Sequence, residues 1–107
     1  MNETLPAFQK TVAAFVEENR LETSVEARLL DLVSEVGELA KEGLKGNEYG
    51  HQSFQPTAEW PGELADAFFS LVCLANSTGL NLEEALAEAL DKYGQRLTTK
   101  GDAGSGR

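Results

Sequence analysis

The sequence contains few of the residues on which many small-protein sites are built. Its 107 residues include one cysteine, Cys73, one histidine, His51, and three prolines. A lone cysteine excludes an intramolecular disulfide and fits a reducing compartment. One cysteine and one histidine far apart in the chain do not make a zinc site. The fold must therefore be stabilised by packing rather than by a disulfide or a structural zinc ion.

Long apolar runs and positive charge are also scarce. No run approaches the roughly 20 apolar residues that a membrane-spanning helix needs, and the N-terminus lacks the basic and apolar regions of a signal peptide. Lysine and arginine total 9 against 18 acidic residues, a formal charge of −9. Binding duplex nucleic acid requires a basic footprint, which this chain lacks. We therefore expect a cytoplasmic protein with no nucleic-acid or membrane partner, although nucleotides that arrive with Mg²⁺ are compatible with it.

Apolar residues recur at helical spacing in four segments, which predicts a single all-α domain over residues 1–100. Thr4, Ser24 and Asn81 suit the residue that caps a helix N-terminus. The Gly-rich, polar residues 101–107 are predicted to form a disordered tail. The expected helices cover about Leu5 to Arg20, Ser24 to an end between Gly43 and Gly46, a start between Ala58 and Gly62 through Ser77, and Leu82 onward.

The third expected helix is apolar nearly all round. Between Ala67 and Ala75 only Ser70 is polar. Such a helix must be buried on almost every side, and three other short helices cannot enclose it. We therefore predict a bundle of four to five helices that is completed by a second copy of the chain, as a dimer or a dimer of dimers.

Two pairs of carboxylates stand at the same spacing on different helices. Glu35 and Glu38 are three residues apart, as are Glu63 and Asp66, so each pair projects from one side of its helix. Donor sets made only of oxygen are those that Mg²⁺ and Mn²⁺ prefer. No histidine stands at the Glu-x-x-His spacing of di-iron bundles. Spacing alone also allows a solvated acidic surface, with Glu63 and Asp66 complementing a helix dipole.

Asp31 and Glu42 extend the first pair into an acidic column along its helix. Like charges at this spacing repel by a few tenths of a kcal/mol per pair. A bound cation would turn that repulsion into ligation, which favours the metal-site interpretation.

The residues around both pairs match a known pattern. The first pair lies in Glu35-Val36-Gly37-Glu38, within the segment 32–40, and the second in Glu63-Leu64-Ala65-Asp66. These segments, and the turn at 79–85, resemble the MazG-type nucleotide pyrophosphohydrolases of the all-α NTP pyrophosphatase superfamily. The similarity covers about residues 5–100. Ser34 departs from the pattern, since many members have a further Glu there, and residues 92–96 match the closing signature only in part.

The resemblance implies hydrolysis of nucleoside triphosphates to nucleoside monophosphate and pyrophosphate, a nucleotide-pool house-cleaning activity that depends on Mg²⁺, with Mn²⁺ as a substitute. It implies four metal ligands, Glu35, Glu38, Glu63 and Asp66. Either Glu35 or Glu38 would hold or deprotonate the attacking water.

Four further residues are predicted substrate contacts. Lys92 and Arg96 would offset phosphate charge, but cations near a helix C-terminus also complement its dipole. Trp60 would stack on a base, or cover the bundle end. Asn76 would hydrogen-bond a base, or simply lie near a helix terminus. The alternative function is a non-catalytic helical dimer whose acidic faces bind a partner protein.

Overall fold

The computed structural model describes residues 3–101, and these form only helices and connecting segments. The elements are α1 (Leu5–Glu18), α2 (Val25–Gly46), the short 3₁₀ helix η1 (Glu48–Gly50), α3 (Trp60–Ser77) and α4 (Leu82–Lys100). No strand occurs between residues 3 and 101, so the all-α prediction is confirmed. The tail predicted at 101–107 lies outside the described residues except for Gly101.

The helices begin where the local chemistry directs them to begin. The side-chain oxygens of Thr4, Ser24 and Asn81 each accept a hydrogen bond from the backbone N–H three residues further on, at 3.3, 3.1 and 3.1 Å. All three predicted N-caps are therefore present. Helix α1 ends at Glu18, two residues before the expected end, because Arg20 adopts a left-handed backbone conformation with φ of 54°.

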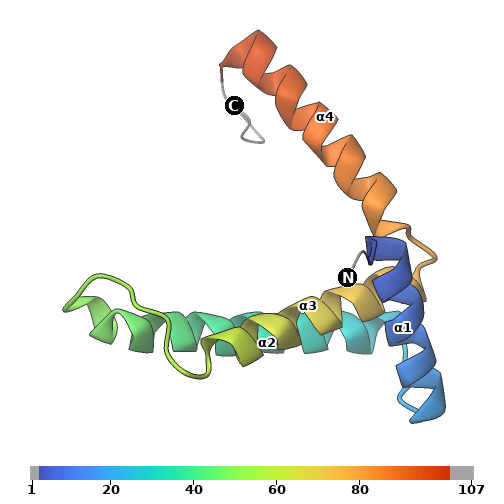
Figure 1. Cartoon of the computed structure of the whole chain (residues 1–107), viewed down its shortest axis with the longest axis horizontal. Helices are drawn as coiled ribbons and strands as arrows, with labels where there is room; N and C mark the ends of the chain where they lie inside the picture. The colour runs from blue at the N-terminus through green and yellow to red at the C-terminus, as the bar shows by residue number, and fades with distance from the viewer. Residues whose placement is uncertain (1–2, 102–107) are drawn as a thin grey trace.

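Helices α2 and α3 run side by side in opposite directions and form the body of the molecule (Figure 1). Helix α1 crosses one end of this pair and packs on α3. Helix α4 starts beside α1 and then projects away from the rest of the chain (Figure 1). The α2–α3 pair is therefore the part of the fold that brings distant residues together.

A buried amide network fixes the junction of α1, α3 and α4. The Nε2 of Gln9 donates to the Oδ1 of Asn76 at 3.0 Å and to the carbonyl of Leu80 at 2.7 Å. Its Oε1 accepts from the N–H of Leu82 at 2.9 Å, and the Nδ2 of Asn76 donates to the Gln9 carbonyl at 3.0 Å. Since buried polar groups need partners, this network specifies how the three helices meet.

The segment between α2 and α3 folds back onto the end of α2. The N–H of Gln55 donates to the Gly46 carbonyl at 3.0 Å, and the rings of Phe54 and Trp60 meet edge to face with centroids 5.0 Å apart. A Cβ atom at Gly46 would lie 2.6 Å from the Phe54 ring and 2.7 Å from the Gln55 carbonyl oxygen. Only glycine permits this close approach.

The chain does not enclose its own apolar faces. Val72, Cys73 and Ala75 on α3 are the buried apolar residues among those described. The accessible surface is 7762 Å², compared with about 5,800 Å² for a folded monomer of this size. The Cα radius of gyration is 16.8 Å, against about 13 Å for a compact chain of similar length. Large apolar side chains that stay exposed include Leu29, Val33, Val36, Leu64, Phe68, Leu71, Leu86, Leu90 and Leu97.

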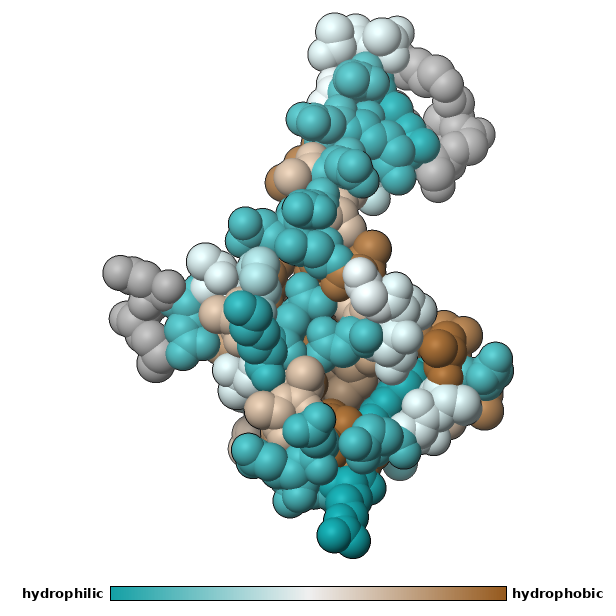
Figure 2. All heavy atoms as spheres, turned by 90° about the vertical axis from the view of Figure 1, so that its right-hand side faces the viewer, coloured by the Kyte–Doolittle hydropathy of each residue, from teal (hydrophilic) through white to brown (hydrophobic). Residues whose placement is uncertain are grey.

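The surface of the projecting helix is correspondingly divided. Seen from the α1 end, α4 presents mostly hydrophilic side chains, with apolar side chains along one edge (Figure 2). In the described part of the chain, no helix is both long enough and apolar enough to cross a membrane.

Candidate metal and substrate site

Three of the four predicted carboxylates lie together between α2 and α3. One oxygen from each of Glu35, Glu63 and Asp66 lies within 4.8 Å of the other two. Glu35 lies midway along α2, and the other two occupy the first two turns of α3. The antiparallel packing of the helices therefore converts two sequence-local pairs into one cluster. Three carboxylate oxygens at this separation suit a hard divalent cation.

Glu38, the fourth predicted carboxylate, stands one turn along α2 from Glu35 and outside the close trio. Its charge nevertheless reaches the site. Burial, and after it the charges of Asp66, Glu38, Glu35 and Glu42, raises the pKa of the Glu63 carboxyl above its ordinary value. Burial and the neighbouring carboxylates both disfavour the ionised form of Glu63, and a cation held among these side chains would favour it.

The two ends of the acidic column have partners of their own. A guanidinium nitrogen of Arg28 lies 3.9 Å from the Asp31 carboxylate. Glu42 is buried, accepts a hydrogen bond from the Thr57 hydroxyl, and lies 3.8 Å from the Lys45 ammonium. Asp31 and Glu42, at the two ends of the column, thus have charged or hydroxyl neighbours of their own, whereas Glu35 in the middle belongs to the trio.

A cavity of about 320 Å³ opens beside the trio. Its walls come from α2 and α3 and combine carboxylates, hydroxyls, one aromatic ring and one guanidinium. Ser34, where the sequence departs from the family pattern, is one of the two hydroxyl residues. The lining residues are Arg28, Asp31, Ser34, Glu35, Asp66, Phe69 and Ser70.

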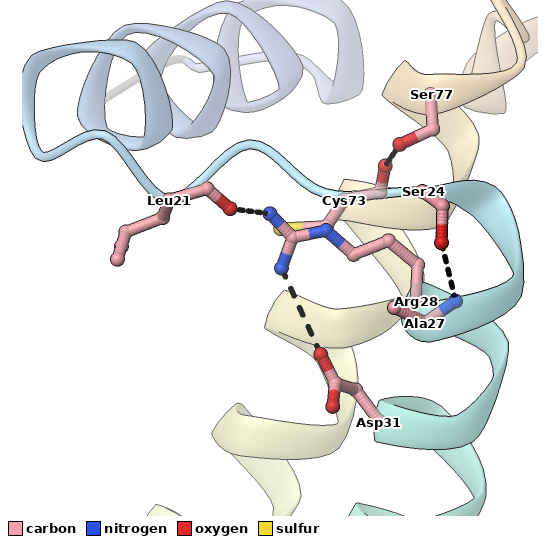
Figure 3. Close-up of polar contacts among 7 residues, drawn as sticks. All are labelled: Leu21, Ser24, Ala27, Arg28, Asp31, Cys73 and Ser77. Atoms are coloured by element: carbon pink, nitrogen blue, oxygen red, sulfur yellow. Dashed lines mark hydrogen bonds and ion pairs between the residues drawn. The ribbon is translucent and has the colours of Figure 1, made fainter.

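Arg28 is the candidate that the sequence alone did not reveal. Its side chain is only 9% exposed, and its Nη2 donates to the Leu21 carbonyl at 2.6 Å (Figure 3). Charged side chains are almost never buried without a partner. An arginine in the first turn of a helix resembles an ordinary surface residue, so no pattern in the sequence signals its burial.

The two predicted phosphate contacts on α4 do not join the trio within one chain. Neither Lys92 nor Arg96 lines the cavity beside Glu35 and Asp66. Lys92 is exposed, with its ammonium 5.2 Å from the centroid of the Tyr93 ring, and Arg96 is half-buried. Their helix projects away from the α2–α3 pair (Figure 1).

Trp60 and Asn76 have structural partners. Trp60 is half-buried at the start of α3, packed on Phe54 and close to Gly43 of α2. Asn76 uses both its amide oxygen and its amide nitrogen on Gln9. Asn76 also lines a second cavity, of about 230 Å³, at the α1 end of the helix pair.

Comparison with known proteins relates this geometry to a family. Residues 23–99 match the family model described as the MazG nucleotide pyrophosphohydrolase domain. The crystal structure of a Bacillus-conserved MazG protein, a nucleotide pyrophosphohydrolase, is 30% identical, with a TM-score of 0.73 over 87% of this chain and 92% of that one.

The crystal structure of YpjD from Bacillus subtilis is 31% identical, with a TM-score of 0.73 over 89% of this chain and 97% of that one. In sequence, the uncharacterized protein YpjD is 37% identical over 73 residues, which are 65% of this chain and 64% of YpjD. That alignment therefore spans just under two thirds of the relative's length.

Proposed function

The chain belongs to the MazG nucleotide pyrophosphohydrolase family, and on that basis we propose that it hydrolyses nucleoside triphosphates to nucleoside monophosphate and pyrophosphate. The observation that supports this most strongly is the trio of Glu35, Glu63 and Asp66, whose oxygens lie within 4.8 Å of one another. We assign these residues, together with Glu38, as ligands for Mg²⁺, with Mn²⁺ as a substitute.

The donor chemistry fits such an ion. The trio offers carboxylate oxygen only, and burial together with the neighbouring carboxylates raises the pKa of Glu63, an effect that a divalent cation would oppose. When bound, the ion would neutralise phosphate oxygens and lower the pKa of water. This matters for a chain of charge −9, because a polyphosphate would otherwise approach a negatively charged surface.

The reaction requires one proton acceptor from the protein. The oxygen of water bonds to the α-phosphorus, and the bond from that phosphorus to the α–β bridging oxygen breaks. Pyrophosphate leaves with the electron pair of that bond. We assign the water's proton to the carboxylate of Glu38, which lies one turn along α2 from Glu35 and is not one of the three carboxylates of the trio. Glu35 is the alternative acceptor.

A second copy of the chain is part of the proposal, in a dimer or a dimer of dimers. An apolar groove between α2 and α3, which includes Leu32, Val36, Leu64, Phe68 and Leu71, is open to solvent. The accessible surface of the chain is larger than that of a compact monomer of the same size. The difference exceeds the roughly 800 Å² per partner that a standard interface buries. A large exposed apolar patch of this kind is typical of an interaction site.

The same assembly would supply the α4 cations. Lys92 and Arg96 lie away from the trio of their own chain, so we propose that they contact the leaving phosphates in a site formed with a second copy. We propose Asn76, which lines the cavity of about 230 Å³, as a contact of the base. Trp60 lies sixteen residues earlier on α3, about 24 Å away along the helix axis, so we propose it as a base contact in a site completed by a second copy. We place the activity in the cytoplasm, as a nucleotide-pool house-cleaning reaction.

Product analysis tests this function. Purified protein is incubated with Mg²⁺ and a panel of canonical and modified nucleoside triphosphates, and the products are separated by anion-exchange chromatography. We expect nucleoside monophosphate and pyrophosphate in equal amounts for at least one substrate. Release of nucleoside diphosphate with inorganic phosphate, or no turnover of any nucleotide at saturating Mg²⁺, would contradict the proposal.

A further inference from the structure

We propose that Arg28 binds the phosphate that remains on the nucleoside, and so positions the substrate across two cavities. The inference rests on the proposed pyrophosphohydrolase function and adds a residue to it. It starts from the burial of Arg28: the side chain is 9% exposed, although a guanidinium is always charged.

The hydrogen bond and the ion pair that Arg28 makes leave some of its N–H donors available. Its Nη2 donates to the Leu21 carbonyl at 2.6 Å, which anchors the side chain on the α1–α2 connection (Figure 3). Its Nη1 lies 3.9 Å from the Asp31 carboxylate, beyond hydrogen-bond distance. The Asp31 side chain is 57% exposed and is therefore not locked in place. Since a guanidinium carries five N–H donors, Nη1 keeps donors for an incoming anion.

Arg28 lies between two cavities and lines both of them. On one side is the cavity of about 320 Å³ that contains Glu35 and Asp66. On the other is the cavity of about 230 Å³ between α1, α2 and α3, with Val16, Cys73 and Asn76 among its lining residues. Arg28 is the residue that lines both. A ligand that spans the two cavities must pass its guanidinium.

The spacing along α2 matches a phosphorylated ligand. Arg28 precedes Glu35 by seven residues, so the two side chains leave the same side of the helix about 10 Å apart along its axis. A phosphate between them would meet the carboxylate-bound ion on one side and the guanidinium on the other. Guanidinium binds phosphate through paired, charge-assisted hydrogen bonds. The less charged nucleoside then belongs in the smaller, more apolar cavity.

This geometry separates the two products. Nucleoside monophosphate carries the phosphate next to Arg28, whereas pyrophosphate lies toward the carboxylates. Loss of the guanidinium should therefore weaken binding of the monophosphate more than binding of pyrophosphate. A purely structural role, in which Arg28 only holds the Leu21 carbonyl, would alter both affinities together or neither.

The experiment measures both products on three variants. Arg28→Met removes the charge, Arg28→Lys keeps it, and Lys41→Met removes one charge from the exposed side of the same helix as the control. Affinities for the monophosphate of the best substrate and for pyrophosphate are measured by calorimetry with Mg²⁺. We expect Arg28→Met to weaken monophosphate binding by about 10- to 100-fold, the size of a lost hydrogen bond to a charged group. Pyrophosphate binding should stay near wild type, Arg28→Lys should recover part of the loss, and Lys41→Met should change neither.

Equal losses for both products, or no loss, would overturn the role of Arg28. If Arg28→Met does not fold, Asp31→Asn tests the same contact with Arg28 intact. Without its competing carboxylate, Arg28 should then bind the monophosphate more tightly while pyrophosphate changes less, and an unchanged ratio of the two affinities would overturn the proposal. A wild-type protein that hydrolyses no triphosphate contradicts the proposed function itself. If the wild type is active but Arg28→Met changes the affinities for monophosphate and pyrophosphate equally, only the role of Arg28 is contradicted.

Discussion

The α2–α3 pair has a carboxylate side, whose side chains one chain brings together, and an apolar side that remains exposed. One side carries Glu35, Glu63 and Asp66, which the single chain already brings within 4.8 Å of one another. The other carries Val36 and Leu64, both about half exposed in an open apolar groove. One chain assembles the carboxylate side, whereas nothing in residues 3–101 covers the apolar side.

Adjacent residues generate this difference. Glu35 precedes Val36, and Glu63 precedes Leu64, and neighbours on an α-helix point about 100° apart. The same short segments therefore build a polar site on one side and an apolar interface on the other. Substitutions of the carboxylates and substitutions of the neighbouring apolar residues can therefore be compared to separate the effect of the site from the effect of the interface.

The largest expected effect comes from the carboxylate side. Glu63→Gln or Asp66→Asn removes a charged ligand from the trio, and we expect turnover to fall by about 100-fold or more, since ion-mediated charge stabilisation contributes several kcal/mol. Steady-state release of pyrophosphate measures it. Glu59→Gln, an exposed carboxylate one turn earlier, is the matched control and should leave turnover unchanged. Similar losses in all three variants would indicate a general charge effect.

The next effect comes from the apolar side. Phe68 lines the open groove, and Phe68→Lys would place like charges against each other in a two-fold interface. We expect light scattering to show a smaller assembly than the wild type at the same low micromolar concentration. The exposed loop variant Ser53→Lys carries the same added charge and should keep the wild-type mass. An unchanged mass for Phe68→Lys would place the interface elsewhere.

A smaller effect is expected at the structural end of the acidic column. Thr57→Val removes the hydroxyl that donates to the buried Glu42. Leaving this buried acceptor without that donor should lower the free energy of unfolding by about 1–3 kcal/mol. Urea unfolding measures it, with Thr98→Val, which loses only an exposed bond to the Gly94 carbonyl, as the control. Equal losses for Thr57→Val and Thr98→Val would show that the hydrogen bond to Glu42 contributes no more to the free energy of unfolding than an exposed one.

The smallest effect is a gain in stability at the site itself. Because the pKa of Glu63 is raised on folding, its ionised form destabilises the metal-free protein. The contribution is absent at pH values below its ordinary range and develops as pH rises through the raised pKa. In a chelator, Glu63→Gln should therefore melt slightly above wild type at neutral pH, and the difference should vanish in acid. A wild type that melts above Glu63→Gln at neutral pH in chelator would contradict a raised pKa of Glu63 in the folded protein.

The features that the sequence predicted well are local. Thr4, Ser24 and Asn81 cap their helices through bonds spanning three residues, and the spacing of each carboxylate pair places both members on one side of a helix. The open apolar surface of α3 also follows from composition, because a helix so rich in apolar residues exceeds what three neighbours can cover.

The features that it missed depend on contacts between distant segments. Arg28 is buried where the connection before α2 presents the Leu21 carbonyl to its guanidinium. Glu42 belongs to an acidic column by spacing, but its partner Thr57 lies fifteen residues further on, in the segment that connects α2 to α3. Which carboxylates form the close trio of Glu35, Glu63 and Asp66 also depends on how the two helices pack, which spacing along one helix does not determine.

Mn²⁺ titration followed by electron paramagnetic resonance tests whether a divalent ion binds at the carboxylate side of the α2–α3 pair. The wild type should bind Mn²⁺, and added Mg²⁺ should displace it. Glu63→Gln, shown to be folded by its melting curve, should lose this binding, while Glu59→Gln should keep it. Wild-type affinity in Glu63→Gln would contradict the assignment of Glu35, Glu63 and Asp66 as the metal site.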